Sequence, residues 1–265
     1  MEEKLIKSCL VGNKKSLEKL IKSIDDLVYN LSLRFLWNKA DAEDATQEIL
    51  IKIITNLSKY EGKSKFKTWV YRVATNHLIN LKKTTLENRS ITFDHFSEEL
   101  NSIKEPVSYE LPDKDLLEKE MKTGCTLAML QCLNRDLRIV FILGSILNIK
   151  SNVACEIVEI SPENFRKRLE KSRNLIRTFL RYNCGVYNTN NKCRCNKRID
   201  FAIAPKRIIK NDLNFVDNIE IYNDEMEELN SMTGIYKNHG NFTNKADFHK
   251  ELHKLINTKR ILNDN

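Results

Sequence analysis

Helix-breaking residues are scarce in this sequence, and their scarcity constrains the fold more than any other feature. The 265 residues include seven glycines and four prolines, while apolar residues recur at intervals of three and four over most of the chain. Glycine and proline mark turns and breaks, and spacing of three to four is typical of amphipathic helices. We therefore predict an all-α protein, long enough for two or three small domains with cores of their own.

The helical periodicity is interrupted in two places, which divides the chain into four segments. Residues 1–84 are predicted to form a compact helical unit, and residues 85–112 lose the periodicity, contain two prolines and are predicted to be a linker. The periodicity returns over 113–182, and the remaining extension, 183–265, is Asn-rich and weakly patterned. The expected architecture is two helical lobes joined by a linker, followed by a mostly irregular extension with one helix near 245–262.

The charge balance favours a polyanionic partner. Lysine and arginine exceed aspartate and glutamate by eight, and the pI is about 9.0. The first ten residues lack the pattern of a signal peptide, and the apolar run Ile139–Leu147 is too short to cross a bilayer. We therefore predict a cytoplasmic protein with reduced cysteines and no membrane partner. The sequence shows no phosphate-binding loop or catalytic constellation, so no enzymatic activity is expected.

The end of the second unit has the pattern of a helix-turn-helix. Ser151 can cap a short helix that runs to about Val158, and Ser161–Pro162–Glu163 is a strong start signal for the next helix. That helix, 162–181, carries seven basic residues and two acids, with apolar residues on its other face. A cationic second helix predicts DNA binding, and a merely solvated basic helix is the alternative. Glu159 occupies a turn position where glycine is common.

Residues 66–83, FKTWVYRVATNHLINLKK, combine aromatic rings, cations and amides on one predicted helix. A core stripe would consist of Trp69, Val73, His77 and Leu81. The accompanying aromatic, Asn and Lys side chains suit unstacked bases better than duplex DNA, because separated bases require flat surfaces and hydrogen-bonding groups. The stretch therefore predicts contact with single-stranded DNA during melting.

Two stretches resemble conserved regions of the extracytoplasmic-function (ECF) sigma factors of bacterial RNA polymerase. DAEDATQEILIKIITNLSKYEGKSKFKTWVYRVATNHLINLKK, residues 41–83, resembles their second region, and CLNRDLRIVFILGSILNIKSNVACEIVEISPENFRKRLEKSRNLIRTFL, residues 132–180, is similar to their fourth. The two occur in the family's order, separated by a linker. The resemblance implies a protein that binds core RNA polymerase, recognises promoter DNA and assists strand opening, while the polymerase performs the chemistry.

The resemblance also implies roles for particular residues. Its minus-ten surface comprises Lys63, Ser64, Lys65, Phe66, Asn76, Asn80, Lys82 and Lys83. Its minus-thirty-five surface comprises Arg166, Lys167, Glu170, Lys171 and Arg173, the last as a phosphate contact. Its polymerase-binding face comprises Asp41, Asp44, Gln47 and Glu48. Asp41 is also the predicted N-cap of the helix that carries this face. An anti-sigma factor is a further partner that the resemblance leaves open.

The segment CGVYNTNNKCRC, residues 184–195, places three thiols close together in sequence. Cys184, Cys193 and Cys195 could bind zinc or another metal with a histidine as fourth ligand; the candidates are His239, His249 and His253. A redox-responsive thiol set and plain structural cysteines are the alternatives. The other four cysteines are predicted to be small core residues. Three rivals remain for the whole chain. The first is a stand-alone helix-turn-helix regulator with a metal- or redox-sensing tail, the second is a helical RNA-binding or scaffold protein, and the third is a metal-sensing module with the DNA lobes as its output.

Overall fold

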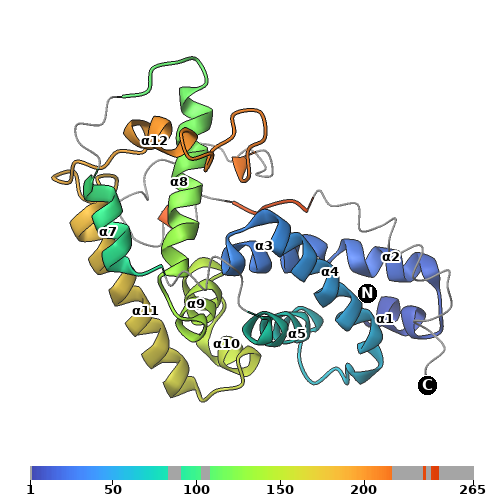
Figure 1. Cartoon of the computed structure of the whole chain (residues 1–265). Coiled ribbons are helices and arrows are strands. Elements are labelled where there is room, and N and C mark those ends of the chain that lie inside the picture. Colours follow the sequence, from blue (N-terminus) through green and yellow to red (C-terminus); the bar gives the residue numbers. More distant parts are fainter. Residues whose placement is uncertain (1, 83–90, 103–107, 217–234, 237–239, 245–265) are drawn as a thin grey trace.

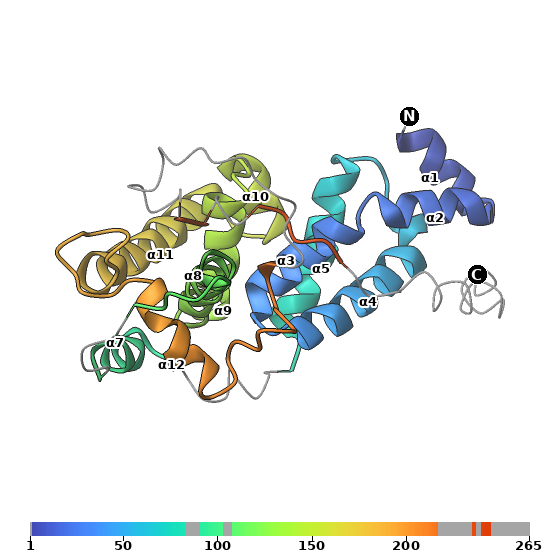
Figure 2. The ribbon, with the colours of Figure 1, turned by 90° about the horizontal axis from the view of Figure 1, so that it is seen from above.

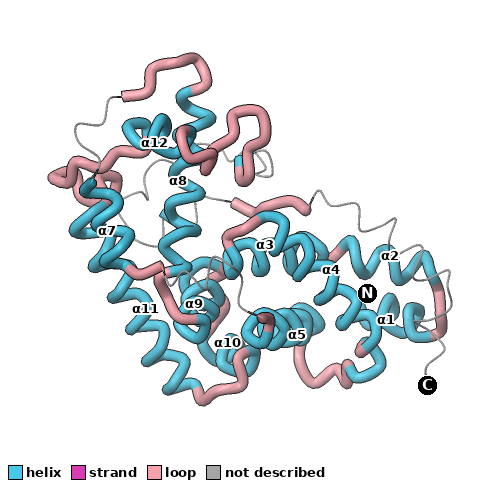
Figure 3. The backbone as a smooth tube through the Cα atoms, viewed as in Figure 1, coloured by secondary structure: helices cyan, strands magenta, loops and turns pink. Residues whose placement is uncertain are grey.

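The all-α prediction is confirmed over the part of the chain that the computed structural model describes, residues 2–82, 91–102, 108–216, 235–236 and 240–244. These residues form helices, turns and isolated bridges, with no β-strand (Figures 1 and 3). No helix within these ranges is long and apolar enough to cross a membrane.

The first lobe contains five α-helices and a short 3-10 turn. They are α1 (Glu2–Leu10), α2 (Lys14–Lys22), α3 (Asp25–Leu36), α4 (Lys39–Thr55), η1 (Leu57–Lys59) and α5 (Phe66–Asn80). Helix α3 packs along α4, and α5 packs against both. Every side chain of α3 from Val28 to Leu36 is buried, so this helix lies at the centre of the lobe.

The second lobe is built on one long helix and the predicted helix-turn-helix. Its elements are α8 (Lys114–Gln131), α9 (Arg135–Phe141), the π-helical turn η2 (Ile142–Ile146), α10 (Ser151–Ile157) and α11 (Pro162–Asn183). Ser161 caps α11, accepting a hydrogen bond from the Asn164 N–H at 3.2 Å, as the sequence predicted. The predicted cap of α10 at Ser151 is wrong: Ser151 is the first residue of the helix, and the N-cap is Lys150, whose side chain makes no cap hydrogen bond.

The two lobes pack directly against each other, and their buried side chains form one continuous core. Figures 1 and 2 show α5 and α3 lying beside α9 and α10. Arg138 is buried at this junction, donating hydrogen bonds to the carbonyls of Phe35 in α3 (2.8 Å) and Leu130 in its own lobe (3.0 Å). Arg135 donates to the carbonyls of Ile79 and Leu81 at the end of α5. These contacts join the lobes because buried carbonyls require donors.

The predicted linker contains a helix, so that part of the prediction is wrong. Helix α7 spans Phe93–Ser102, within the segment expected to be irregular. Its aromatic residues Phe93 and Phe96 pack on Phe179 of α11, with ring centroids 5.4 and 5.2 Å apart. The helix is stabilised by this tertiary packing rather than by a long periodic pattern, which is why sequence periodicity missed it.

The first part of the C-terminal extension folds back onto α8. Residues Ile199, Ala202, Ile208 and Leu213 form a small second core with Leu117 of α8 and Tyr109. The buried carboxylate of Glu120 accepts three backbone N–H bonds, from Asn214, Phe215 and Val216, at 2.8–3.0 Å. This segment includes a 3-10 turn, η3 (Asn196–Arg198), and helix α12 (Ile199–Ile203), and is otherwise irregular. The helix expected near 245–262 lies outside the described residues.

Candidate nucleic-acid and polymerase interfaces

Helix α5 begins on an aromatic cluster rather than on an exposed base-binding ring. Phe66 is 1% exposed and stacks on Trp69 at 5.7 Å, and Tyr60 packs edge-on to Phe66 at 5.3 Å. The Tyr60 hydroxyl donates to the Ser64 carbonyl at 2.7 Å, which fixes the loop before the helix. Phe66 is therefore covered in this conformation, and a base could stack on it only after this cluster opens; its DNA contact stays a prediction.

The buried stripe of α5 also differs from the predicted one. We predicted Trp69, Val73, His77 and Leu81; the stripe at four-residue spacing is Phe66, Val70, Ala74 and Leu78. Because α5 packs against α3 and α4 and also against α10, a wide face of it is covered. His77 is buried as expected, whereas Trp69, Val73 and Leu81 are half-buried.

His77 connects α5 to the middle of α4. Its Nδ1 lies 2.6 Å from Lys52 Nζ, and its Nε2 lies 3.4 Å from a Glu48 carboxylate oxygen. Burial and the neighbouring Lys52 cation lower the pKa of His77, more than the Glu48 carboxylate raises it. The ring therefore acts as a neutral acceptor for the Lys52 ammonium.

The remaining polar residues of the predicted minus-ten surface are accessible. Asn76 and Asn80 are exposed one turn apart on α5, and Asn80 Nδ2 donates to the Asn76 carbonyl at 2.8 Å. In the preceding loop Lys65 is exposed, Ser64 is half-buried and Lys63 is exposed but paired with Glu61. Lys82 is exposed after the helix. Lys83 lies outside the described residues.

The acidic face of α4 is partly as expected. The N-cap is Asn38, whose side chain accepts from the Asp41 N–H at 3.0 Å, so the predicted cap at Asp41 is wrong. Asp41 instead occupies the first turn, where the helix dipole favours a negative charge. Asp44 is exposed and Gln47 half-buried, while exposed Glu48 faces His77.

The helix-turn-helix has the close packing that this motif requires. Glu159 in the turn has a φ of +54°, the left-handed region suggested by its glycine-like position. Gly144 allows α11 to approach η2, because a Cβ there would lie 2.9 Å from Leu169 and 3.3 Å from Phe165. The apolar face of α11 is buried as predicted: Phe165, Leu169, Ile176, Phe179 and Leu180.

The opposite face of α11 presents the predicted cations to solvent. Arg166, Lys167, Glu170 and Lys171 are all exposed, and Lys167 pairs with Glu163 one turn earlier at 2.7 Å. Arg173 is different: it is half-buried, and its Nε donates to Ser145 Oγ at 2.9 Å. Arg173 therefore ties α11 to η2, and we assign it a structural contact in place of the predicted phosphate contact.

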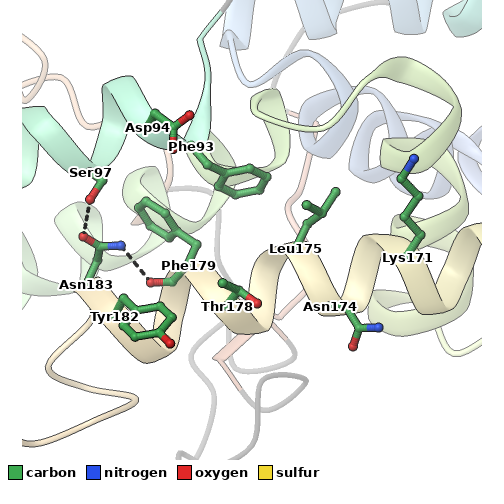
Figure 4. A pocket seen from close by; sticks show the side chains of 10 residues that line it. All are labelled: Phe93, Asp94, Ser97, Lys171, Asn174, Leu175, Thr178, Phe179, Tyr182 and Asn183. Atoms are coloured by element: carbon green, nitrogen blue, oxygen red, sulfur yellow. Dashed lines mark hydrogen bonds between the residues drawn. The ribbon is translucent and has the colours of Figure 1, made fainter.

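A groove of about 750 Å³ lies between α7 and α11, beside these cations (Figure 4). Phe93, Phe179 and Leu175 form its apolar part, and Lys171 lies at one end. Ser97 Oγ donates to Asn183 Oδ1 at 2.7 Å, which closes α7 onto the end of α11. The groove thus extends the exposed face of α11 without adding a catalytic group.

The three cysteines of the extension come together, and a fourth joins them. Cys184 and Cys193 form a backbone bridge, and both line a cavity with Cys195. Cys125 of α8 lines the same cavity. It was predicted to be a small core residue, and nothing in the sequence indicated that it would lie beside the other three thiols. Its position 59 residues before Cys184 gives no sequence signal of the kind that short Cys spacing provides. His239, His249 and His253 lie outside the described residues.

Known proteins share the sequence of the first lobe. Residues 20–85 match the family model described as sigma-70 region 2, which covers α3, α4 and α5. The chain therefore contains the second region of a sigma-70-type factor.

Matches to individual proteins indicate which kind of sigma factor the chain resembles. The chain is 35% identical over 80 residues to the ECF RNA polymerase sigma factor SigW of Bacillus subtilis; that match covers 30% of this chain and 43%, less than half, of SigW. It is 24% identical over 180 residues to the RNA polymerase sigma-H factor of Pseudomonas aeruginosa, covering 66% of this chain and 91% of that protein. A match to the ECF RNA polymerase sigma-E factor of Haemophilus influenzae, 25% identical, covers 66% and 93%. The match to sigma-70 region 2 and the matches to several ECF sigma factors together support the resemblance of this chain to the ECF sigma factors.

Among solved structures, the chain is similar to CnrH, whose structure was determined in complex with the cytosolic domain of CnrY. That likeness has a TM-score of 0.47 and 14% identity, and covers 66% of this chain and 94% of CnrH.

Proposed function

We propose that this protein binds core RNA polymerase, directs it to specific promoters and assists the opening of the DNA strands. It acts in the cytoplasm with the polymerase, which performs the chemistry, so the chain itself is not an enzyme. The observation that carries the proposal is the presence of two different DNA-suited surfaces on one chain. The exposed asparagines and lysines around α5 suit unstacked bases, and the exposed cations of α11 suit a duplex major groove.

The exposed acidic face of α4 supports a third interaction, with the polymerase. Asp44 and Glu48 lie on its solvent side with Gln47, within the segment that matches sigma-70 region 2. Like-charged DNA would be repelled by this face, so a protein partner suits it better. A stand-alone helix-turn-helix regulator would need only the second lobe and gives no reason for the α4 face or the α5 amides.

Function as a sigma factor requires the two lobes to separate. Elements centred near minus-ten and minus-thirty-five are about 25 base pairs apart, or roughly 85 Å at about 3.4 Å per base pair. A compact chain of this length is roughly 45–50 Å across. DNA of this length is much shorter than its persistence length of about 150 base pairs and remains nearly straight. The closed body therefore cannot reach both elements, and the contact of α5 with α10 opens when the protein engages a promoter.

Reversing one charge on α4 tests the proposed polymerase contact. Asp44→Arg should abolish stable binding to bacterial core RNA polymerase, because one desolvated contact would become repulsive. Fluorescence anisotropy of labelled protein titrated with core enzyme measures the affinity. Glu98→Arg, at an exposed acid in the middle of α7, is the matched control and should bind as the unmodified chain does.

Circular dichroism of both variants checks that their helices are retained. Binding of Asp44→Arg at the control's affinity would reject the α4 face as the polymerase contact. Failure of the unmodified chain to bind core enzyme would reject the proposed function itself.

A further inference from the structure

Four cysteines from three separate segments surround one small cavity of about 40 Å³ beneath the extension. Cys125 comes from the middle of α8, Cys184 from the end of α11, and Cys193 and Cys195 from the following loop. Lys122 lines the same cavity. All four thiols are free, so none is committed to a disulfide.

The loop is built to hold Cys184 and Cys193 side by side. The Gly185 N–H donates to the Cys193 carbonyl at 3.1 Å, which forms the bridge between the two segments. A Cβ at position 185 would lie 2.1 Å from that carbonyl oxygen, so only glycine permits the approach. Asn191 Nδ2 donates to the Cys184 carbonyl at 3.2 Å and closes the loop.

The backbone also directs N–H groups at one sulfur. Burial raises the pKa of the Cys184 thiol, and backbone hydrogen bonds from Tyr187 and Val186 act in the opposite direction, since they favour the thiolate. Hydrogen bonds of this kind orient and tune the ligands of metal sites. A merely structural cysteine in a core has no need of them.

A divalent ion among the four cysteines would bind them as thiolates, because a coordinated thiol is deprotonated outright. Lys122 and Arg198 lie close enough to offset the remaining negative charge of four thiolates around one divalent ion.

We infer that Cys125, Cys184, Cys193 and Cys195 together bind one zinc ion as a closed, four-thiolate structural site. Among the described residues, no three His, Cys, Asp or Glu side chains already stand at the spacing of bound ligands. Binding therefore draws the sulfurs inward, to about 3.8 Å apart for a tetrahedral site with Zn–S bonds of about 2.3 Å. Rotation between χ1 rotamers moves a cysteine sulfur by about 3 Å, and such rotations are the adjustment that we expect on binding.

This site joins α8, α11 and the extension at one point, and it does not depend on the proposed transcriptional role. Four thiolates complete the coordination of zinc, so the site needs no histidine from 245–265. Closure around the ion would further stabilise the loop that follows α11, since metal binding and local folding are coupled. Cys125 is the residue that distinguishes this site from one completed by His249 or His253.

Metal analysis of the full chain, purified in reducing buffer, tests the inference. We expect about one zinc per chain, and we expect Cys125→Ser and the Cys193→Ser/Cys195→Ser double variant to retain less than about a tenth of it. Cobalt substituted for zinc should give intense sulfur-to-metal charge transfer and the visible bands of a tetrahedral four-thiolate site. Cys9→Ser and Cys132→Ser, at thiols away from the cavity, are the matched controls and should keep the ion.

Alkylation with mass spectrometry makes the test independent of variant folding. In the zinc-loaded unmodified chain these four cysteines should be protected, and they should react after chelation. Full metal content in Cys125→Ser together with metal loss in His249→Ala/His253→Ala would overturn the four-thiolate assignment. A chain without metal after zinc addition, or one with a Cys184–Cys193 disulfide, would overturn the zinc site altogether.

Discussion

A cross-link between α5 and α10 should abolish promoter-dependent transcription. In the closed structure Arg72 Nε donates to the Glu156 carbonyl at 3.2 Å, which places the two helices in direct contact. A photoreactive benzoylphenylalanine in place of Arg72 should therefore cross-link to α10 when the free protein is irradiated. The cross-linked fraction should be inactive, because a closed body cannot span two elements about 85 Å apart.

The order of irradiation provides the control for this experiment. The same protein kept dark should transcribe, and irradiation after assembly with core enzyme and promoter should give no α5–α10 cross-link. The same label at Lys67, exposed on α5, should leave activity unchanged in light or dark. Normal transcription by purified cross-linked protein would show that the lobes need not separate.

Removing two cations from α11 should produce the largest loss of DNA affinity. Lys167→Ala/Lys171→Ala should weaken binding to the upstream promoter element by roughly 100-fold, because each base or phosphate contact contributes about 1–3 kcal/mol. Discrimination at one or two base pairs should fall with it. Binding of holoenzyme to a library of promoter variants, measured at several salt concentrations, reports both quantities.

Arg173→Ala is the matched control, since the structure gives this cation a structural role. Loss of its bond to Ser145 should reduce the free energy of unfolding by about 1 kcal/mol and leave the salt dependence of DNA binding unchanged. If Arg173→Ala instead lowers the salt slope by about one, Arg173 contacts a phosphate after all. If the double lysine variant binds like the unmodified chain, α11 does not read the promoter.

Local signals in the sequence were sufficient for the helix-turn-helix. The Ser161 cap, the proline after it and the apolar positions of α11 are interactions between residues close in the chain, and the structure has all of them. The exposed positions of Lys167 and Lys171 follow from the same 3.6-residue period. By contrast, Phe66 is buried against Tyr60, which lies in the turn before α5. The helical period does not show this contact, so it predicted the wrong buried stripe for α5.

Features that depend on distant partners could not be predicted. In the sequence, Glu120 is an ordinary acidic residue of a helix. In the structure, residues 214–216 donate their backbone N–H groups to its carboxylate. Cys125 joins the other thiols only because the extension folds back along α8. Helix α7 is too short to be stable alone and forms against Phe179.

Run-off transcription with bacterial core RNA polymerase tests the central claim most directly. Core enzyme alone and core enzyme with this protein would be compared on a pool of fragments from the genome that encodes it, with transcript ends mapped by sequencing. The proposed function predicts new transcripts with defined starts, preceded by two shared elements near minus-ten and minus-thirty-five, only when both proteins are present. Transcripts identical to those of core enzyme alone, with the protein binding promoter fragments unaided, would contradict it.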